Sequence, residues 1–251
     1  MIKNYVISLR SANDRRNHIE NEFAKNKVDF EFFNAIEPID NDSILNIFSI
    51  EKKRTEQLSN QELACLLSHL SLWQRAIDNN LDYIGVFEDD IFLGKNADYL
   101  LNNNEWLKGK DILKLEKFHR KAEFSIRSMR IEGINRKIYK LLGKNLGTGG
   151  YILSNQGCRY MINYLKAIEN IDPVDILMFN QVKHKKQLPV FQLQPAIVIQ
   201  DSILNPNNTN LPSSIYHNEK LENKKDNILD KIKKETIRAI RSLRVRNIYF
   251  Q

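Results

Sequence analysis

The feature that most constrains this chain is a short apolar run that ends in three consecutive acids. Residues 83–87 read Tyr-Ile-Gly-Val-Phe and are followed directly by Glu88, Asp89 and Asp90. A run this short, apolar and partly β-branched is typical of a strand buried on both faces of a sheet. The carboxylates then fall at the carboxyl end of the strand, where open α/β sheets place their ligand crevice. The pattern predicts an α/β fold with a ligand site at the sheet edge.

Side chains alternate along an extended chain, which predicts how these acids point. Glu88 and Asp90 are expected on one side and Asp89 on the other. Two converging carboxylates repel each other unless a cation lies between them, and Mg²⁺ or Mn²⁺ with a diphosphate as co-ligand suits this chemistry. An acidic loop that only caps the next element fits the spacing equally well.

The flanking sequence predicts alternating strands and helices. We expect strands over residues 5–9, 29–35, 111–116 and 192–199, and one after the glycines of 147–150. We expect helices over residues 13–25, 97–107, 156–167 and 174–182, with the strongest helix running from a capping box at Ser59 to about Asn79. Residues 38–57 indicate a loop with a short helix, and the basic residues 117–145 indicate an irregular excursion. This β-α-β progression favours a mostly parallel sheet flanked by helices.

Composition narrows the class of protein. The 251 residues carry a net charge of +7 and are 42% hydrophobic. These values fit a globular protein whose partner is a nucleic acid, an anionic membrane surface or a phosphorylated small molecule. Cys65 and Cys158 lie in apolar helical patterns and indicate neither a metal cluster nor a disulfide framework, so a reducing, cytosolic compartment is the simplest interpretation. The apolar run near residue 1 is too short for us to expect a signal peptide, and the given residues show no apolar span of membrane length, no Gly-x-Gly-x-x-Gly motif and no Walker motif.

Two turns are candidate anion or ligand sites. The arginine-rich turn of residues 10–16 joins the first strand to a helix, where free amides and guanidinium groups favour a diphosphate. A solvated basic turn is the alternative. The glycines of 147–150 allow a ligand to approach the backbone closely, or they only form a tight turn.

The chain is expected to divide into a body and a basic tail. Residues 1–204 would form the body, residues 205–219 a Pro/Asn-rich linker, and residues 220–251 a basic amphipathic helical tail. Apolar residues share one helical face of the tail and are surrounded by lysines and arginines, which predicts binding to an anionic membrane surface through residues 228–246. An ordinary helix packed on the body is the alternative.

Together these motifs resemble glycosyltransferase family 25, the bacterial lipooligosaccharide and collagen-type β-galactosyltransferases. The resemblance spans residues 4–202 and rests on the order of several stretches: Ile7–Leu9 with the arginines that follow, Phe33–Ala35, Glu62–His69 with Trp73, Val86–Asp90, Gly147–Ser154, Pro173–Asp175 and Gln200–Ser202. One departure is Ala64, where the family usually has glycine before the cysteine. We expect only a packing change there.

The resemblance implies a GT-A-like fold, a UDP-sugar donor and Mn²⁺ or Mg²⁺. Asp90 would ligate the ion directly, and Glu88 would hold it through water or hold the donor ribose. The implied donor-binding residues are Ser8, Leu9, Arg10, Asn34, Ala35, Ser68, His69, Glu88, Asp89, Gly149 and Gly150. The two glycines would admit the sugar close to the backbone. By its spacing alone, His69 is more often a hydrogen-bonded structural residue.

The resemblance also implies inverting transfer of a hexose, with galactose as the expected sugar and UDP-glucose or another UDP-sugar as the alternative donor. Asp175 is the expected general base, with Asp201 and Glu116 in reserve. The expected acceptor is a lipooligosaccharide core, reached from the cytoplasm by a protein peripheral to the inner membrane. A nucleic-acid-binding protein is the competing class, but no helix-turn-helix, RRM or zinc pattern accompanies the basic residues, so no nucleic acid is expected.

Overall fold

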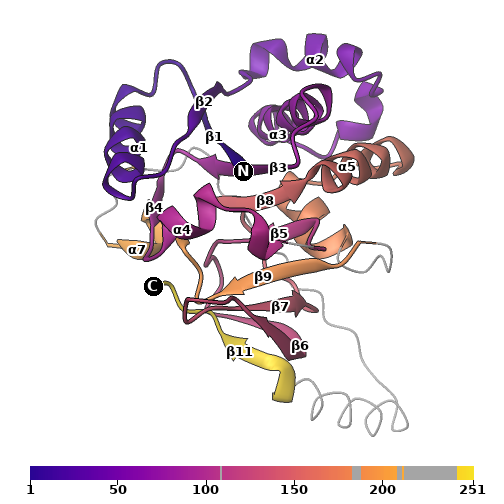
Figure 1. Cartoon of the computed structure of the whole chain (residues 1–251). Coiled ribbons are helices and arrows are strands. Elements are labelled where there is room, and N and C mark those ends of the chain that lie inside the picture. Colours follow the sequence, from indigo (N-terminus) through magenta and orange to yellow (C-terminus); the bar gives the residue numbers. More distant parts are fainter. Residues whose placement is uncertain (108, 183–187, 208–210, 212–241) are drawn as a thin grey trace, which may run out of the picture.

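One nine-stranded sheet organises the molecule, and its strands follow the order β11-β6-β7-β9-β5-β8-β3-β1-β2 (Figure 1). The structure is a computed structural model that describes residues 1–107, 109–182, 188–207, 211 and 242–251. The strands of this sheet are β1 (Ile2–Ser8), β2 (Glu31–Asn34), β3 (Tyr83–Glu88), β5 (Ile112–Lys114), β6 (Lys121–Arg130), β7 (Lys137–Leu141), β8 (Gly150–Ser154), β9 (Val190–Gln194) and β11 (Val245–Asn247). A separate antiparallel pair joins β4 (Ile91–Leu93) to β10 (Val198–Gln200).

The sheet is mixed in direction. β1 runs parallel to both β2 and β3, and β5 runs parallel to β9, whereas β8 is antiparallel to both of its neighbours. Tracing all pairings, β2, β1, β3, β5, β9 and β6 point one way and β8, β7 and β11 point the other way. The expected α/β fold is confirmed, and the sheet is mostly parallel in the sense that six of its nine strands point the same way. The carboxyl ends of β3, β5 and β9 therefore lie at one edge.

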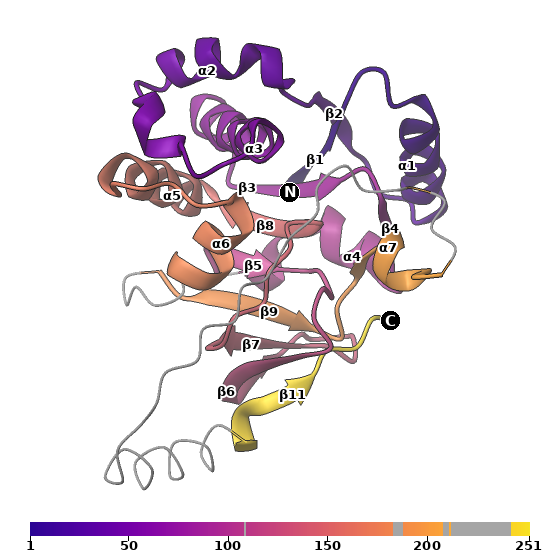
Figure 2. The ribbon, with the colours of Figure 1, turned by 180° about the vertical axis from the view of Figure 1, so that it is seen from behind.

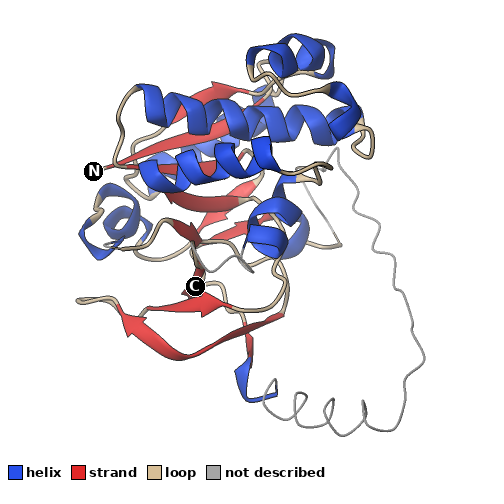
Figure 3. Ribbon diagram, turned by 90° about the vertical axis from the view of Figure 1, so that its right-hand side faces the viewer, coloured by secondary structure: helices blue, strands red, loops and turns tan. Residues whose placement is uncertain are grey.

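Helices cover both faces of the sheet (Figure 3). They are α1 (Asn13–Lys25), α2 (Asn41–Ile47), α3 (Asn60–Asp78), α4 (Ala97–Asn102), α5 (Asn155–Ala167), α6 (Val174–Ile176) and α7 (Asp201–Leu204), and a π-helical turn, Leu177–Gln181, continues α6. The sheet has a hydrophobic core on each face, and successive residues of β8 point into opposite cores. Tyr151 and Leu153 pack in the cluster that contains α3 and α5, while Ile152 packs with α1 and α4.

The capping box at Ser59 correctly predicts the start of α3, the longest helix among the described residues. The Ser59 side chain accepts a hydrogen bond from the Glu62 backbone N–H (3.2 Å), and the Glu62 carboxylate accepts one from Ser59 N–H (2.9 Å). These reciprocal bonds satisfy two amides at the start of α3. Its stripe, with Leu66 and Leu67 fully buried, then packs against the sheet.

Residues 117–145 are not an irregular excursion, so that prediction is wrong. β6 and β7 form an antiparallel hairpin that places Phe124 and Leu141 in the core. Residues 192–199 also differ from the prediction, because cis Pro195 and its neighbours separate β9 from β10, which belong to different sheets.

The end of the chain belongs to the body. β11 adds to the outer edge of β6, and Ile248 is buried (Figures 1 and 2). The Gln251 carbonyl accepts hydrogen bonds from Arg136 Nη2 (2.6 Å) and Lys95 N (3.0 Å). The predicted helical tail is therefore wrong over residues 245–251, where strand pairing replaces the helix. Residues 212–241, which hold most of the predicted membrane-binding helix, lie outside the described residues.

The predicted linker also contacts the body. Leu211 is buried, and its N–H donates to Asp201 Oδ2 at 2.9 Å. Among the described residues, no helix has both the length and the apolar character needed to cross a membrane.

Candidate active site

The three acids after β3 point as their alternation predicts. Gln200 Nε2, at the end of β10, donates to Glu88 Oε2 (2.8 Å) and lies 3.3 Å from Asp90 Oδ1. Asp89 turns away and pairs with Arg15, at 2.5 Å between Nη1 and Oδ1. One amide nitrogen therefore touches both carboxylates that were predicted to share a ligand.

These carboxylates are poorly neutralised. Burial, followed by repulsion from Asp90 and Glu116, raises the pKa of Glu88 to about 8. Burial likewise raises the pKa of Asp90 to about 6, although the Arg15 guanidinium opposes the shift. Desolvation disfavours a charged carboxylate, and a nearby like charge adds to that cost. The pair consequently favours either a proton or a cation.

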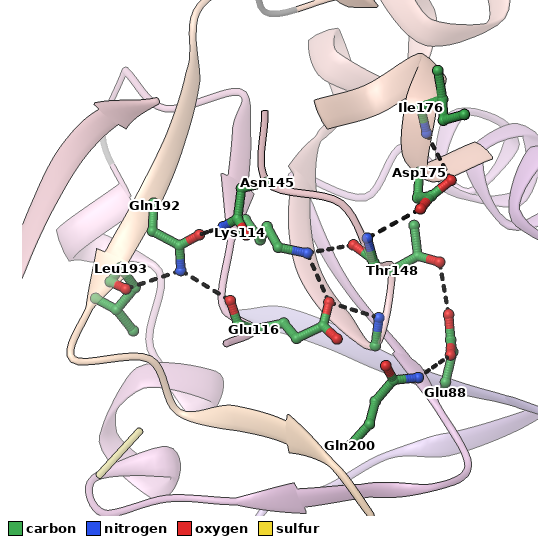
Figure 4. Close-up of polar contacts among 12 residues, drawn as sticks. Glu88, Lys114, Glu116, Asn145, Thr148, Asp175, Ile176, Gln192, Leu193 and Gln200 are labelled. Atoms are coloured by element: carbon green, nitrogen blue, oxygen red, sulfur yellow. Dashed lines mark hydrogen bonds and ion pairs between the residues drawn. The ribbon is translucent and has the colours of Figure 1, made fainter. Parts of the chain in front are cut away.

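A three-residue loop before β8 gathers acids from three elements (Figure 4). Gly147 N–H donates to Asp175 Oδ2 (3.2 Å), and the Thr148 hydroxyl donates to Glu88 Oε1 (2.6 Å). Gly149 N–H donates to Glu116 Oε2 (3.1 Å). Each successive residue thus holds a different acid, which links β3, the end of β5 and the start of α6.

Gly147 is required in this loop. Its φ of +87° lies in the left-handed region, which side chains with a Cβ rarely adopt. A Cβ at this position would also lie 2.6 Å from the Phe118 ring.

Gly149 and Gly150 have protein side chains packed closely against them. A Cβ on Gly149 would lie 2.8 Å from Glu116 Oε1, and one on Gly150 would lie 2.7 Å from a Val198 methyl group. These contacts explain both glycines, and their approach to the donor sugar stays a prediction. The glycines allow Glu116 and β10 to pack against the start of β8.

Glu116, the reserve candidate for the general base, forms a buried ion pair with Lys114, which the sequence pattern was not used to predict. Lys114 Nζ lies 2.7 Å from Glu116 Oε2 and also donates to the Gly147 carbonyl, and both side chains are fully buried. Burial raises the pKa of Glu116 despite the ammonium group. Glu116 Oε1 has no hydrogen-bond partner among the described residues. The missed signal is a lysine and an acid at alternate positions of an otherwise apolar strand, which requires that the two pair.

Asp175, the expected base, lies beside this cluster. It is 3% exposed, and its Oδ1 accepts a hydrogen bond from Ile176 N–H at 2.8 Å. The reserve Asp201 does not join the cluster. Its oxygens accept hydrogen bonds from Asn205 Nδ2 (2.7 Å) and Leu211 N–H, and these contacts fix α7.

The predicted nucleotide-binding residues of the first two strands meet at the same edge. Ile7 is in register with Glu88, and Ala35 N–H donates to the Ser8 carbonyl (2.9 Å). Arg16 Nη2 donates to that carbonyl (3.1 Å) and to Asn34 Oδ1 (2.7 Å). Leu9 and Arg10 follow Ser8 and are exposed. These residues border the acids, as a nucleotide pocket requires.

Ser68 and His69 do not face this edge. The Ser68 hydroxyl donates to the Ala64 carbonyl and accepts from Ile36 N–H. His69 is fully buried, with Nδ1 2.7 Å from the Tyr151 hydroxyl. The prediction that the two residues contact the donor is contradicted, because neighbouring segments of the chain enclose both side chains.

His69 is part of a packed triad with Tyr151 and Trp73. Trp73 Nε1 donates to the Tyr151 oxygen at 3.0 Å. An indole nitrogen only donates, so the phenolic hydrogen is free to donate to His69 Nδ1. Burial lowers the pKa of His69 to about 3 and keeps the imidazole neutral.

Comparison with known proteins decides the family. A model of glycosyltransferase family 25 (LPS biosynthesis protein) matches residues 1–178. The chain belongs to this family. Family 25 membership makes it a glycosyltransferase, and it places the acid cluster described above in an enzyme that acts on glycosyl donors.

Several family 25 relatives resemble nearly the whole chain. A putative glycosyltransferase of Haemophilus influenzae is 36% identical over 236 residues, which cover 92% of this chain and 83% of that protein. The lipooligosaccharide biosynthesis protein lic2B of Haemophilus influenzae is 33% identical and covers 94% and 88%. The lacto-N-neotetraose biosynthesis glycosyltransferase LgtB of Neisseria meningitidis serogroup B is 31% identical and covers 95% and 92%.

The chain also shows a distant likeness to solved structures. A glycosyltransferase involved in glycosylation of the major capsid of PBCV-1 aligns over 79% of this chain and 93% of its own, with a TM-score of 0.41 and 8% identity. A likeness this weak supports no argument about the site.

The acid cluster suits the divalent cation that the family resemblance implies. Glu88 and Asp90 converge on Gln200 Nε2, and burial raises the pKa of each carboxylate, although the Arg15 guanidinium opposes the shift of Asp90. The described residues contain no group of three or more His, Cys, Asp or Glu side chains arranged to hold a metal ion. The protein thus offers a pair of carboxylates. Mg²⁺ and Mn²⁺ accept such a pair, because they take their remaining ligands from water and phosphate.

Proposed function

We propose that this family 25 glycosyltransferase moves a hexose, galactose in the first instance, from a UDP-sugar to a lipooligosaccharide or lipopolysaccharide core sugar. The observation that carries the proposal is the gathering of acids around residues 147–149, at the edge where β1, β2 and β3 end. Two relatives support the acceptor class, since lic2B is a lipooligosaccharide biosynthesis protein and LgtB is a lacto-N-neotetraose biosynthesis glycosyltransferase.

The donor would lie along the ends of the first three strands. Ser8, Asn34 and Ala35 would border the nucleotide, and Asp90 with Glu88 would hold Mn²⁺ or Mg²⁺. When bound, the ion stabilises negative charge on the departing UDP. Glu88 would then ionise more readily, since a cation favours the charged form of a nearby carboxylate.

We assign the general base to Asp175. Transfer with inversion requires a group that accepts the proton of the acceptor hydroxyl as that oxygen attacks the anomeric carbon. Two backbone N–H donors fix the Asp175 carboxylate next to the loop that binds Glu88. Glu116 suits the role less well, because Lys114 and Gly149 already bind its Oε2 and the residue is fully buried.

We also propose that the enzyme works at the cytoplasmic face of the inner membrane, where residues 228–244, the part of the predicted segment before β11, would bind anionic lipid. The support is the basic amphipathic pattern of that sequence. Flotation with phosphatidylglycerol vesicles tests this point, and binding equal to that with neutral vesicles would contradict it.

Donor binding is the decisive test of the function. Thermal unfolding should shift upward with UDP and Mn²⁺ together, less with either alone, and not at all after EDTA is added. A panel of UDP-galactose, UDP-glucose and UDP-N-acetylglucosamine, each with a lactose acceptor, identifies the sugar. NMR of the new anomeric proton then reports retention or inversion. The proposal fails if no UDP-sugar is consumed and UDP leaves the unfolding temperature unchanged.

A further inference from the structure

A polar cavity lies on the same face of the sheet as the acid cluster, at the outer strands. It has a volume of about 360 Å³ and lies between β7, β9 and β11. Lys137 and Arg246 contribute positive charge to its lining, and no acidic residue takes part. Its electrostatic character is thus opposite to that of the acid cluster.

The cavity combines aromatic rings with hydrogen-bonding amides. Tyr139 forms a buried wall and Tyr249 is 61% exposed at the rim. Amide side chains come from Asn135, Gln194 and Asn247. Aromatic faces pack against the apolar faces of sugar rings, while amides donate to and accept from hydroxyl groups.

Two of these side chains are already oriented. Arg246 Nη1 donates to the Tyr139 hydroxyl (3.1 Å), and its guanidinium lies 4.8 Å from the Tyr139 ring centroid. Gln194 Nε2 is shielded from solvent and has no hydrogen-bond partner among the described residues. Because a nitrogen shielded from solvent cannot contact a ligand in an open cavity, Arg246, Lys137 and the two tyrosines are the groups available to one.

The register of the sheet connects this cavity to the acid cluster. Lys114 on β5 lies opposite Gln192 on β9, which lies opposite Tyr139 on β7. Register partners share a face of the sheet, and neighbouring strands are about 4.8 Å apart, so the cavity begins roughly 10 Å from the Lys114–Glu116 pair. β9 runs parallel to β5, which places Gln194 toward the same end of the sheet as Glu116.

We propose that this cavity binds a sugar residue of the acceptor that carries a phosphate or carboxylate group, at a distance from the hydroxyl that is glycosylated. The proposal rests on the function proposed above. Arg246 and Lys137 would bind the anion, and Tyr139 and Tyr249 would contact the ring. A neighbouring cavity shares Asn135 and Lys137 and adds Arg130, Arg136 and Glu132, but no aromatic residue lines it, so we assign the sugar ring to the first one.

Direct binding tests the site without any need for turnover. Calorimetry on the full chain should show that glucose 6-phosphate binds more tightly than glucose and than inorganic phosphate, and Arg246→Gln should weaken this binding about tenfold. Arg244→Gln is the matched control. It removes the same charge two residues before Arg246, from a side chain that faces Glu123 and does not line the cavity. Lys137→Gln provides a second test if the Arg246 variant folds poorly. Equal binding by both arginine variants overturns the proposal, as does binding of anionic vesicles but not of the sugar phosphate.

Kinetics then separates this proposal from the proposed function. With an acceptor that carries a phosphate, Arg246→Gln should raise KM for that acceptor about tenfold and leave kcat and KM for the UDP-sugar unchanged. With lactose, the variant should match wild type. Absence of transfer by the wild-type enzyme would refute the proposed function while leaving the binding result valid. A uniform loss of kcat with both acceptors would refute the cavity's role.

Discussion

Two buried polar clusters lie on the same face of the sheet and differ in how well their charges are balanced. The acids around residues 147–149 repel one another, and burial raises the pKa values of Glu88, Asp90 and Glu116. The triad of His69, Tyr151 and Trp73 is uncharged, and its members hydrogen-bond one another. The first cluster carries negative charge that a cation can neutralise, whereas the second is neutral and contributes packing, although His69 Nε2 has no hydrogen-bond partner among the described residues. Burial of a polar residue does not by itself identify a functional site; the distinguishing feature is uncompensated charge.

Asp175→Asn should cause the largest loss of kcat if the acid cluster is the active site. Removing a general base lowers kcat by about 10²–10⁴-fold. UDP and Mn²⁺ should still raise the unfolding temperature as in wild type. Glu116→Gln is the comparison variant, and a larger loss of kcat in that variant would move the base from Asp175 to Glu116.

Asp90→Asn should lower activity and raise stability together. Loss of one group that stabilises developing charge through the ion costs roughly 10²–10³-fold in kcat. Because Asp90 is buried beside Glu88, removal of its charge should raise the unfolding temperature at pH 7 in the absence of metal. The stabilisation by UDP with Mn²⁺ should disappear. A variant that is less stable than the wild type without metal would show that the cluster is balanced after all.

Lys114→Met tests whether the ion pair holds the acid cluster in place. It leaves Glu116 buried without its partner, which costs about 3–5 kcal/mol in the free energy of unfolding. The double variant Lys114→Met with Glu116→Gln should recover part of this loss, because no uncompensated charge remains. Urea unfolding of wild type, both single variants and the double variant gives the coupling. Strictly additive losses would exclude the pairing.

His69→Phe should have the smallest effect. It should change the pH dependence of the free energy of unfolding and leave kcat unchanged. The pKa of His69 is about 3 in the folded chain, against 6.5 ordinarily, so between these values the unfolded chain binds a proton that the folded chain does not. The free energy of unfolding therefore falls as pH decreases from about 6.5, by at most about 1.4 kcal/mol per pH unit.

Urea unfolding between pH 4.5 and 7 measures that slope. It should be shallower in His69→Phe than in wild type. Trp73→Phe is the control, because it weakens the triad but keeps the imidazole and hence the slope. An unchanged slope in His69→Phe would place the pH dependence elsewhere, and a large loss of kcat per folded molecule would restore His69 to the active site.

The sequence alone determined the elements whose signal is local. The capping box at Ser59 defined α3, and the apolar run before Glu88 defined β3 together with the opposite directions of Asp89 and Asp90. Alternation and capping depend on near neighbours in the chain, so the pattern is enough. The family was also identifiable from the order of its short motifs.

Only the tertiary structure decided which distant residues meet. Neither the enclosure of His69 by Tyr151 nor the contact of Asp175 with Gly147 follows from spacing along the chain. The basic hairpin β6–β7 and the strand β11 have weak local patterns because their partners supply the missing hydrogen bonds and apolar contacts. Strand pairing across 100 or more residues therefore created both the Arg246 cavity and the acid cluster's surroundings, since its free energy comes from non-local contacts that no short window of sequence contains.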